Sequence, residues 1–285
     1  MRAVELRPLL PEDAPAVHEL AMAAFEDLAR RAGEPPHPPP DPAAAHLRIR
    51  RLATTDPGGA WAAVEDGALA GAALALVREG LWGLSLLVVH PRVQSRGIGR
   101  ALLARALAHG DGARGHVILA SDDARALRAY VRAGLTFHPT ARAEGVPRAL
   151  AAPSGVRLME AGDRALTDAV GRHVRGAAHG DDLDALRAGG AEVLVLPDGG
   201  YAAHNQGDVR LLAAFDALAA RTLLRAVLAR APAGRSAAVP WLTGDQAWAV
   251  DVALDAGLEL RLEGALFLSG ETGPFTPYLP SGAYL

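Results

Sequence analysis

The chain has 285 residues, of which 50% are hydrophobic, and a formal net charge of −3 at pH 7. This length exceeds a typical single domain and predicts two, and the weakly acidic balance gives no basis for a nucleic-acid surface. The absence of cysteine excludes disulfides, thiolate metal sites and a cysteine nucleophile. No signal-peptide core opens the sequence, and no apolar run reaches the roughly 18 residues that span a bilayer. We therefore expect a cytoplasmic protein without membrane or nucleic-acid partners.

The first ninety residues predict a strand, two helices and an antiparallel meander. A strand at 4–9 is followed by a helix that begins at Pro11 and repeats apolar residues at helical spacing. The proline-rich stretch 34–42 cannot be helix or central strand, so it is expected to be a stiff surface loop. A short helix at 43–52 then precedes three strands joined by tight turns, at 60–65, 69–78 and 81–89.

The stretch 89–103 carries the strongest signal, because an apolar strand runs into a glycine-bearing turn that opens into a helix. Gly97 and Gly99 leave backbone N–H groups accessible, and the helix dipole adds positive potential, so the turn predicts an anion site. Leu102 stands where the dinucleotide fingerprint needs its third glycine, and no Gly-Lys-Ser/Thr follows. From these residues alone, a tight turn that merely packs a helix on a sheet stays open.

The motif Gln94-x-x-Gly97-x-Gly99, placed after a strand end, resembles the acetyl-coenzyme A signature of the GCN5-related N-acetyltransferase (GNAT) family. The block 118–135 is similar to a second element of that family, a strand followed by an Asn-x-x-Ala-x-x-x-Tyr helix and a glycine turn. Asp123 stands where asparagine is usual. The resemblance implies a mixed α/β (α+β) fold in which a mostly antiparallel central sheet is flanked by helices.

The resemblance also implies acetyl-coenzyme A as co-substrate, with no metal. It places the carrier against backbone groups at the strand end, against the amides of the turn, and near Asp123. The implied binding residues are Val88, Val89, Gln94, Ser95, Arg96, Gly97, Ile98, Gly99, Arg100, Ala101 and Asp123. For the side chains of Arg96 and Arg100, a role as solvated surface charge is an equal alternative.

The family mechanism is direct attack of a neutral amine on the thioester. Tyr130 is the implied general acid for the departing thiolate, and a packed aromatic without catalytic role is the alternative. The general base is left open, because the strand at 81–87 has no carboxylate. The candidates are a water chain and the side chains of Glu26, Asp27, His37, His46, Glu65 and Ser85.

The second half of the chain repeats the first in weaker form. The segment 156–163 echoes 4–13, the helix 220–228 resembles 99–107, and 246–258 tracks 125–135. We therefore predict a catalytic first lobe at 1–150 and a degenerate second lobe at 151–285 that ends in an extended tail. Leu218 and Ala220 replace the two glycines of the turn, and Ala253 stands at the position of Tyr130, so a second phosphate site is not expected.

The leading functional hypothesis is acetyl transfer to a small-molecule or peptide amine, catalysed by a monomer or homodimer. A non-catalytic acyl-coenzyme A sensor and a transferase of a larger acyl group are the alternatives. The aromatic and proline-rich tail at 274–285 is expected to dock on a lobe of its own chain rather than on a second protomer.

Overall fold

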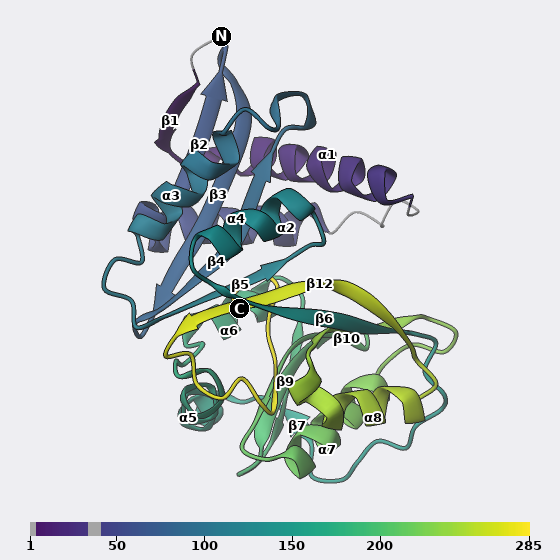
Figure 1. Cartoon of the computed structure of the whole chain (residues 1–285). Helices are drawn as coiled ribbons and strands as arrows, with labels where there is room; N and C mark the ends of the chain where they lie inside the picture. The colour runs from purple at the N-terminus through teal and green to yellow at the C-terminus, as the bar shows by residue number, and fades with distance from the viewer. Residues whose placement is uncertain (1–3, 34–40) are drawn as a thin grey trace. The chain divides into compact units, whose positions relative to one another are not determined.

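The structure, a computed structural model of the whole chain (Figure 1), describes residues 4–33 and 41–285. The chain divides into two compact units, an N-terminal unit at 1–113 and a C-terminal unit at 114–285, and each is described by itself. Most of the predicted proline-rich loop, including His37, lies outside the described residues. Among the described residues, no helix combines the length and the apolar character needed to cross a membrane.

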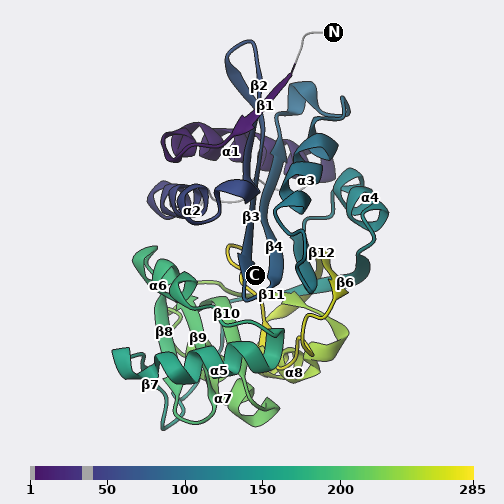
Figure 2. The same ribbon diagram turned by 90° about the vertical axis from the view of Figure 1, so that its left-hand side faces the viewer.

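The N-terminal unit is an antiparallel sheet with helices on both faces. Its strands lie in the order β1-β2-β3-β4, which confirms the predicted meander. In Figure 2, α1 and α2 cover one face of this sheet and α3 covers the other. The elements are β1 (Glu5–Pro8), α1 (Ala14–Ala32), α2 (Pro42–Thr55), β2 (Ala60–Glu65), β3 (Ala68–Arg78), β4 (Leu81–Val89) and α3 (Ile98–Ala108).

Small residues in β3 allow α3 to lie close to the sheet. A methyl group added at Gly71 would come within 2.8 Å of Leu102 Cδ1 and 3.1 Å of the Val88 carbonyl oxygen, closer than normal packing permits. At the other end of the helix, the buried indole of Trp82 donates a hydrogen bond of 2.9 Å to the Ala106 carbonyl. These contacts fix α3 against β3 and β4, and with it the turn that precedes the helix.

The C-terminal unit begins with a four-stranded sheet that joins early and late segments of the chain. Its strands lie in the order β5-β12-β6-β11, and β12 is antiparallel to both β5 and β6. In sequence, β5 and β6 are joined by α4 alone, but in the sheet β12 lies between them. The sequence did not predict this insertion. The elements are β5 (Gly115–Ala120), α4 (Ala124–Arg132), β6 (Thr136–Gly145), β11 (Ala237–Leu242) and β12 (Glu259–Gly270).

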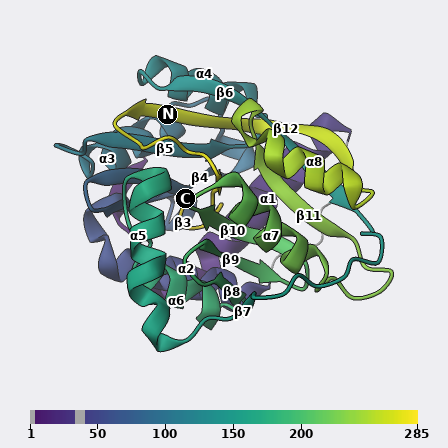
Figure 3. The same ribbon diagram turned by 90° about the horizontal axis from the view of Figure 1, so that it is seen from below.

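The second sheet of this unit has the order β13-β10-β9-β8-β7 and is also antiparallel. Figure 3 shows α5 and α7 on opposite sides of its strands. Leucine, valine and alanine side chains from α7, α8 and the sheet form a continuous buried core. The elements are β7 (Arg157–Leu158), α5 (Arg164–Arg175), α6 (Asp181–Ala188), β8 (Glu192–Leu196), β9 (Gly200–Asn205), β10 (Asp208–Ala214), α7 (Ala217–Leu228), α8 (Ala247–Asp255) and β13 (Tyr278–Leu279).

The element order confirms the predicted duplication. The series from β7 to β12 repeats the series from β1 to β6, with two helices after the first strand, then a meander, and then alternating helices and strands. The fold is therefore mixed α/β, with mostly antiparallel sheets flanked by helices. Compact units and repeated lobes divide the chain at different places, and the lobe boundary near residue 150 stays a prediction.

Candidate active site

The turn between β4 and α3 has the backbone geometry of an anion site. Ser95 and Gly97 both adopt left-handed conformations, with φ of 63° and 87°. The first helical hydrogen bond runs from the Ala101 amide to the Gly97 carbonyl at 3.0 Å, so the amides of 98–100 have no acceptor within the helix. Ser95, Arg96 and Gly97 are exposed. Exposed amides at the positive end of a helix dipole suit an anionic group.

The two glycines of the turn serve different purposes. A methyl group added at Gly97 would meet no atom within 4 Å, so this position needs glycine for its positive φ and not for space. A methyl group at Gly99 would lie 3.4 Å from Val89 Cγ2, at the limit of ordinary contact. Gly99 therefore lets the helix start close to the end of β4.

Residues at the end of β4 hold the turn in place. The Gln94 side-chain amide donates a hydrogen bond of 3.0 Å to the Val89 carbonyl. His90 accepts a hydrogen bond of 3.2 Å from the Arg92 amide at Nδ1, and so serves as a turn residue. Gln94 thus contributes to the shape of the turn through its side chain, in addition to any contact of its amide with a ligand.

A β-bulge interrupts β4 at Ser85. Leu74 pairs with Leu86, but the next residue of β3, Ala75, pairs with Leu84, so β4 has one extra residue at this point. Bulges bend a strand and redirect the side chain that they carry. Ser85 is the extra residue of this bulge, and it is 8% exposed. The bulge therefore places a buried hydroxyl in the middle of an otherwise apolar stretch of β4.

Arg96 is held by a carboxylate that the sequence did not link to it. Its guanidinium donates to Glu65 at 2.6 and 3.2 Å, and these hydrogen bonds raise the pKa of Arg96. The Arg96 and Glu65 side chains are 33% and 14% exposed. No spacing rule connects the end of β2 with this turn, and from the sequence Glu65 is a candidate base only. In the structure, the Glu65 carboxylate forms an ion pair with Arg96.

Tyr130 lies in α4, in the C-terminal unit, and is 4% exposed. Its ring packs edge-on against Phe267 of the inserted strand β12, with 5.4 Å between ring centroids. Burial, and secondarily the charge of Asp123, raises the pKa of the phenol. The phenol is therefore protonated at neutral pH, as a hydrogen-bond donor to a leaving group must be.

Asp123 caps α4. One carboxylate oxygen accepts the Arg125 amide at 2.8 Å, and the carboxylate also binds the Arg125 guanidinium at 2.6 and 3.0 Å. Asparagine, the usual residue of the family motif, could cap the helix but could not form this ion pair. The departure from the motif thus has a local structural reason.

The remaining candidates for a general base have varied surroundings. Asp27 forms ion pairs with Arg30 and Arg31 on α1, while Glu26 is exposed. His46 of α2 packs against His18 of α1 with 5.3 Å between ring centroids. Burial, and then the charge of His46, lowers the pKa of His18. Within the described ranges no three metal-binding side chains converge.

The second lobe has a different residue at the corresponding helix start. Asp216 caps α7, and its carboxylate accepts the Ala219 amide at 2.8 Å. Leu218, in place of Gly97, is 76% exposed. An amide that already binds a carboxylate is not free for a phosphate, and the carboxylate repels one.

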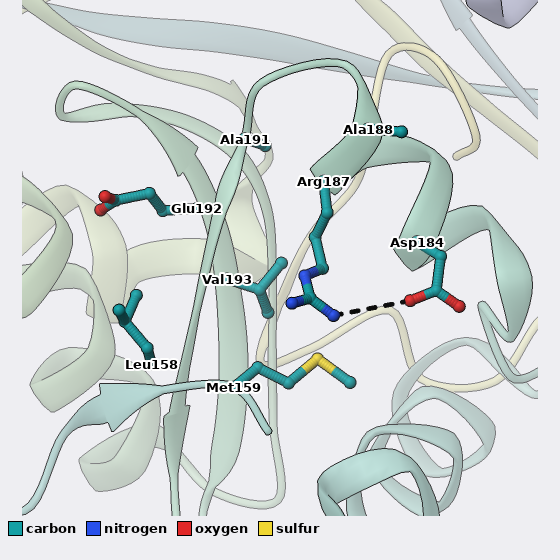
Figure 4. Close-up of a pocket in the computed structure, with 8 residues that line it drawn as sticks. All are labelled: Leu158, Met159, Asp184, Arg187, Ala188, Ala191, Glu192 and Val193. Atoms are coloured by element: carbon teal, nitrogen blue, oxygen red, sulfur yellow. Dashed lines mark ion pairs between the residues drawn. The ribbon is translucent and has the colours of Figure 1, made fainter. Parts of the chain in front are cut away.

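An open cavity of about 520 Å³ lies in the C-terminal unit between β7, β8 and α6. Figure 4 shows the side chains that line it. Arg187 and Asp184 form an ion pair of 3.7 Å beside it. None of the predicted site residues lines this cavity. Its lining residues are Leu158, Met159, Asp184, Arg187, Ala188, Ala191, Glu192 and Val193.

Comparisons with known proteins agree with the repeated architecture. The sequence profile of the Acetyltransferase (GNAT) family matches residues 15–135. A candidate acetyltransferase from Pyrococcus horikoshii has a TM-score of 0.81 at 16% identity, over 100% of this chain and 97% of its own. A GCN5-related N-acetyltransferase from Sphaerobacter thermophilus has a TM-score of 0.57 at 18% identity, with 94% and 96% of the two chains covered.

A tandem GNAT protein from the clavulanic acid biosynthesis pathway has a TM-score of 0.56 at 18% identity, with 94% of this chain and 99% of that protein covered. At these identities the solved structures establish the fold alone. A comparison with curated proteins finds no match. Residues 15–135 thus match the GNAT family of acetyltransferases, and the chain as a whole has the fold of GNAT proteins, a tandem one among them.

Proposed function

We propose that the chain is an acetyl-coenzyme A-dependent N-acetyltransferase whose acceptor is a small-molecule or peptide amine. The observation that carries this proposal is the exposed turn at 94–100, in which two left-handed residues precede the amides of α3. The turn fits a diphosphate because no side chain fills the space at Gly97. Backbone groups of Val88 and Val89 are proposed to meet the pantetheine arm, and Arg96 and Arg100 to border the phosphates.

The proposed reaction is a direct displacement. The acetyl thioester supplies the electrophilic carbonyl carbon, the acceptor nitrogen bonds to that carbon, and the carbon–sulfur bond breaks to give the amide and the thiolate. The amine loses its proton to water or to a base that the residues do not identify. Tyr130 is proposed, on the family motif, to donate a hydrogen bond to the departing sulfur. The pKa of a phenol is already above that of a thiol, and burial raises the pKa of Tyr130 further. Tyr130 is therefore proposed to stabilise the thiolate by a hydrogen bond more than by complete proton transfer.

The test is release of free coenzyme A from acetyl-coenzyme A in the presence of an amine panel, read with a thiol reagent. The chain has no cysteine, so the reagent reports the product alone. We expect thiol release with at least one amine, together with calorimetric binding of acetyl-coenzyme A. Binding without thiol release would replace this proposal with the acyl-coenzyme A sensor, and faster turnover of longer thioesters would identify a larger acyl group.

A further inference from the structure

The C-terminal tail, residues 274–285, lies against the second lobe. Its strand β13 pairs with β10, with Tyr278 opposite Ala213 and Leu279 opposite Leu212. The ladder continues with a hydrogen bond of 3.3 Å from the Ala214 amide to the Pro277 carbonyl. Figure 3 shows the yellow tail ending beside β10. The expected intramolecular docking is thus confirmed.

The edge that the tail covers corresponds to the predicted pantetheine site of the first lobe. β10 is the last strand of its meander and precedes α7, as β4 is the last strand of its own meander and precedes α3. Ala213 and Ala214 end β10 as Val88 and Val89 end β4. In the second lobe, the backbone groups at this strand end are already paired with a peptide.

The apolar side chains of the tail are buried to the degree of core residues. Phe275 is 4% exposed, and Tyr278 and Leu279 are 0% exposed. The Phe275 and Tyr278 rings meet edge to face with 5.2 Å between centroids. The buried side-chain amide of Gln246 donates a hydrogen bond of 2.8 Å to the Phe275 carbonyl. This burial favours the docked tail through the hydrophobic effect.

A polar cluster makes the docking specific. His179 is 1% exposed, and its two ring nitrogens lie 2.8 Å from the Tyr201 hydroxyl and 3.0 Å from the Tyr278 hydroxyl. Burial lowers the pKa of His179, so the ring is neutral, with one nitrogen that donates and one that accepts. The Arg175 side chain, 2% exposed, also lies beside Tyr278. Without the tail, these buried polar groups would lose the partner that Tyr278 provides.

At the start of α7, where the first lobe has its predicted phosphate site, the second lobe carries the negative charge of Asp216. Asp216 uses its carboxylate to cap α7, at the position that the diphosphate would occupy by analogy with the first lobe. The tail and Asp216 therefore occupy the two ends of one site. Either feature alone would weaken the binding of a carrier at this site.

We propose that the C-terminal tail is the resident ligand of the second lobe, an extended peptide that fills the coenzyme slot along β10. The chain then binds one acyl carrier and not two. The count of one carrier rests on the function proposed for the first lobe. The placement of the tail does not.

The test uses the absence of native cysteine, which makes an introduced thiol a unique reporter. Leu279→Cys places the thiol on the buried tail strand, and Leu218→Cys is the matched control, because Leu218 is 76% exposed in the same lobe. We expect a maleimide to label the Leu279→Cys variant at least about 100-fold more slowly than the control, since only molecules with an opened tail react. Saturating acetyl-coenzyme A, which has no free thiol, should leave this rate unchanged.

Calorimetry on the unmodified chain should give one acetyl-coenzyme A per chain. Labelling of Leu279→Cys as fast as the control, acceleration of that labelling by acetyl-coenzyme A, or two carriers per chain would each overturn the proposal. Slow labelling with no heat of binding would reject the proposed acetyl transfer and still support the tail assignment.

Hydrogen exchange of the unmodified chain provides a second measurement if Leu279→Cys does not fold. The amides of Tyr278 and Leu279 should exchange as slowly as those of β9, with and without acetyl-coenzyme A. Fast exchange across the tail would overturn the proposal without any substitution.

Discussion

Arg157 donates two hydrogen bonds to Asp163, at 2.6 and 2.7 Å, and clamps the first strand of the second lobe to the turn that starts α5. Arg7 and Asp13 form the same clamp in the first lobe, at 2.7 and 2.8 Å and with the same spacing of six residues. Each aspartate also accepts a backbone amide, from Glu160 and Leu10 respectively, at 2.8 Å. The clamp is therefore a feature that both copies retain.

Asp163→Ala should destabilise the chain by about 1 kcal/mol, because it removes a capping acceptor and the partner of Arg157. For a protein of this size this corresponds to a fall in melting temperature of about 2–4 °C. Asp13→Ala is the matched variant, and a similar shift is expected from differential scanning calorimetry. Unchanged melting in both variants would show that the clamp contributes nothing to stability.

Acid should remove the contribution of this clamp. Its hydrogen bonds with Arg157 lower the pKa of Asp163 to about 2, from 3.8. A carboxyl group whose pKa is lower in the folded state stabilises the fold above its unfolded pKa, and loses this contribution as the pH falls through its folded pKa. The difference in melting temperature between the wild type and Asp163→Asn should therefore shrink between about pH 4 and pH 2. A difference that stays constant over this range would contradict the pKa shift.

Gly97→Ala should weaken acetyl-coenzyme A binding. Alanine pays about 1–2 kcal/mol in the left-handed region, so the free turn relaxes and binding must restore it, at a loss of about tenfold in affinity. Gly67→Ala is the control, because Gly67 has a similar φ of 77° and, like Gly97, no atom within 4 Å of an added methyl group. Calorimetry should show reduced affinity for Gly97→Ala only. Equal affinities would indicate that the turn does not bind the carrier.

Glu65→Gln should strengthen acetyl-coenzyme A binding by about two- to fivefold, since it removes a negative charge beside the turn and releases Arg96 from its ion pair. The gain should diminish at high salt, because the carboxylate and Arg96 are partly exposed. Glu12→Gln, the same change of charge before α1, serves as the control. Weaker binding in Glu65→Gln would mean that Glu65 orients Arg96 for the phosphates instead of competing with them.

Tyr130→Phe should lower turnover by about 10²-fold or more while acetyl-coenzyme A affinity changes little, because the lost hydroxyl acts on the leaving sulfur. Tyr201→Phe removes a buried hydroxyl from the second lobe and should leave turnover near the wild-type value. Because burial raises the pKa of Tyr130, wild-type turnover should show no loss from phenol ionisation up to pH 10. Wild-type turnover in Tyr130→Phe would leave the residue as the packing partner of Phe267 only.

Local patterns in the sequence were sufficient to predict most elements and the turn at 94–100. Strands β2 and β4 have the predicted bounds, and the glycine turn precedes a helix as expected. The two arginine–aspartate clamps are local in the same way, since in each lobe the partners lie six residues apart. Such features depend on backbone conformations and contacts between residues that are close in the chain.

The tertiary structure decided the features that join distant segments. The insertion of β12 between β5 and β6, which brings Phe267 against Tyr130, leaves no mark in the spacing of either strand, because a strand's pattern specifies a buried face and not its neighbour. The ion pair of Glu65 with Arg96 and the pairing of the tail with β10 likewise join residues that are far apart in sequence. The sequence determined the elements and the chemistry that each carries, and folding alone decided which of them meet, because contacts between distant residues depend on packing in three dimensions.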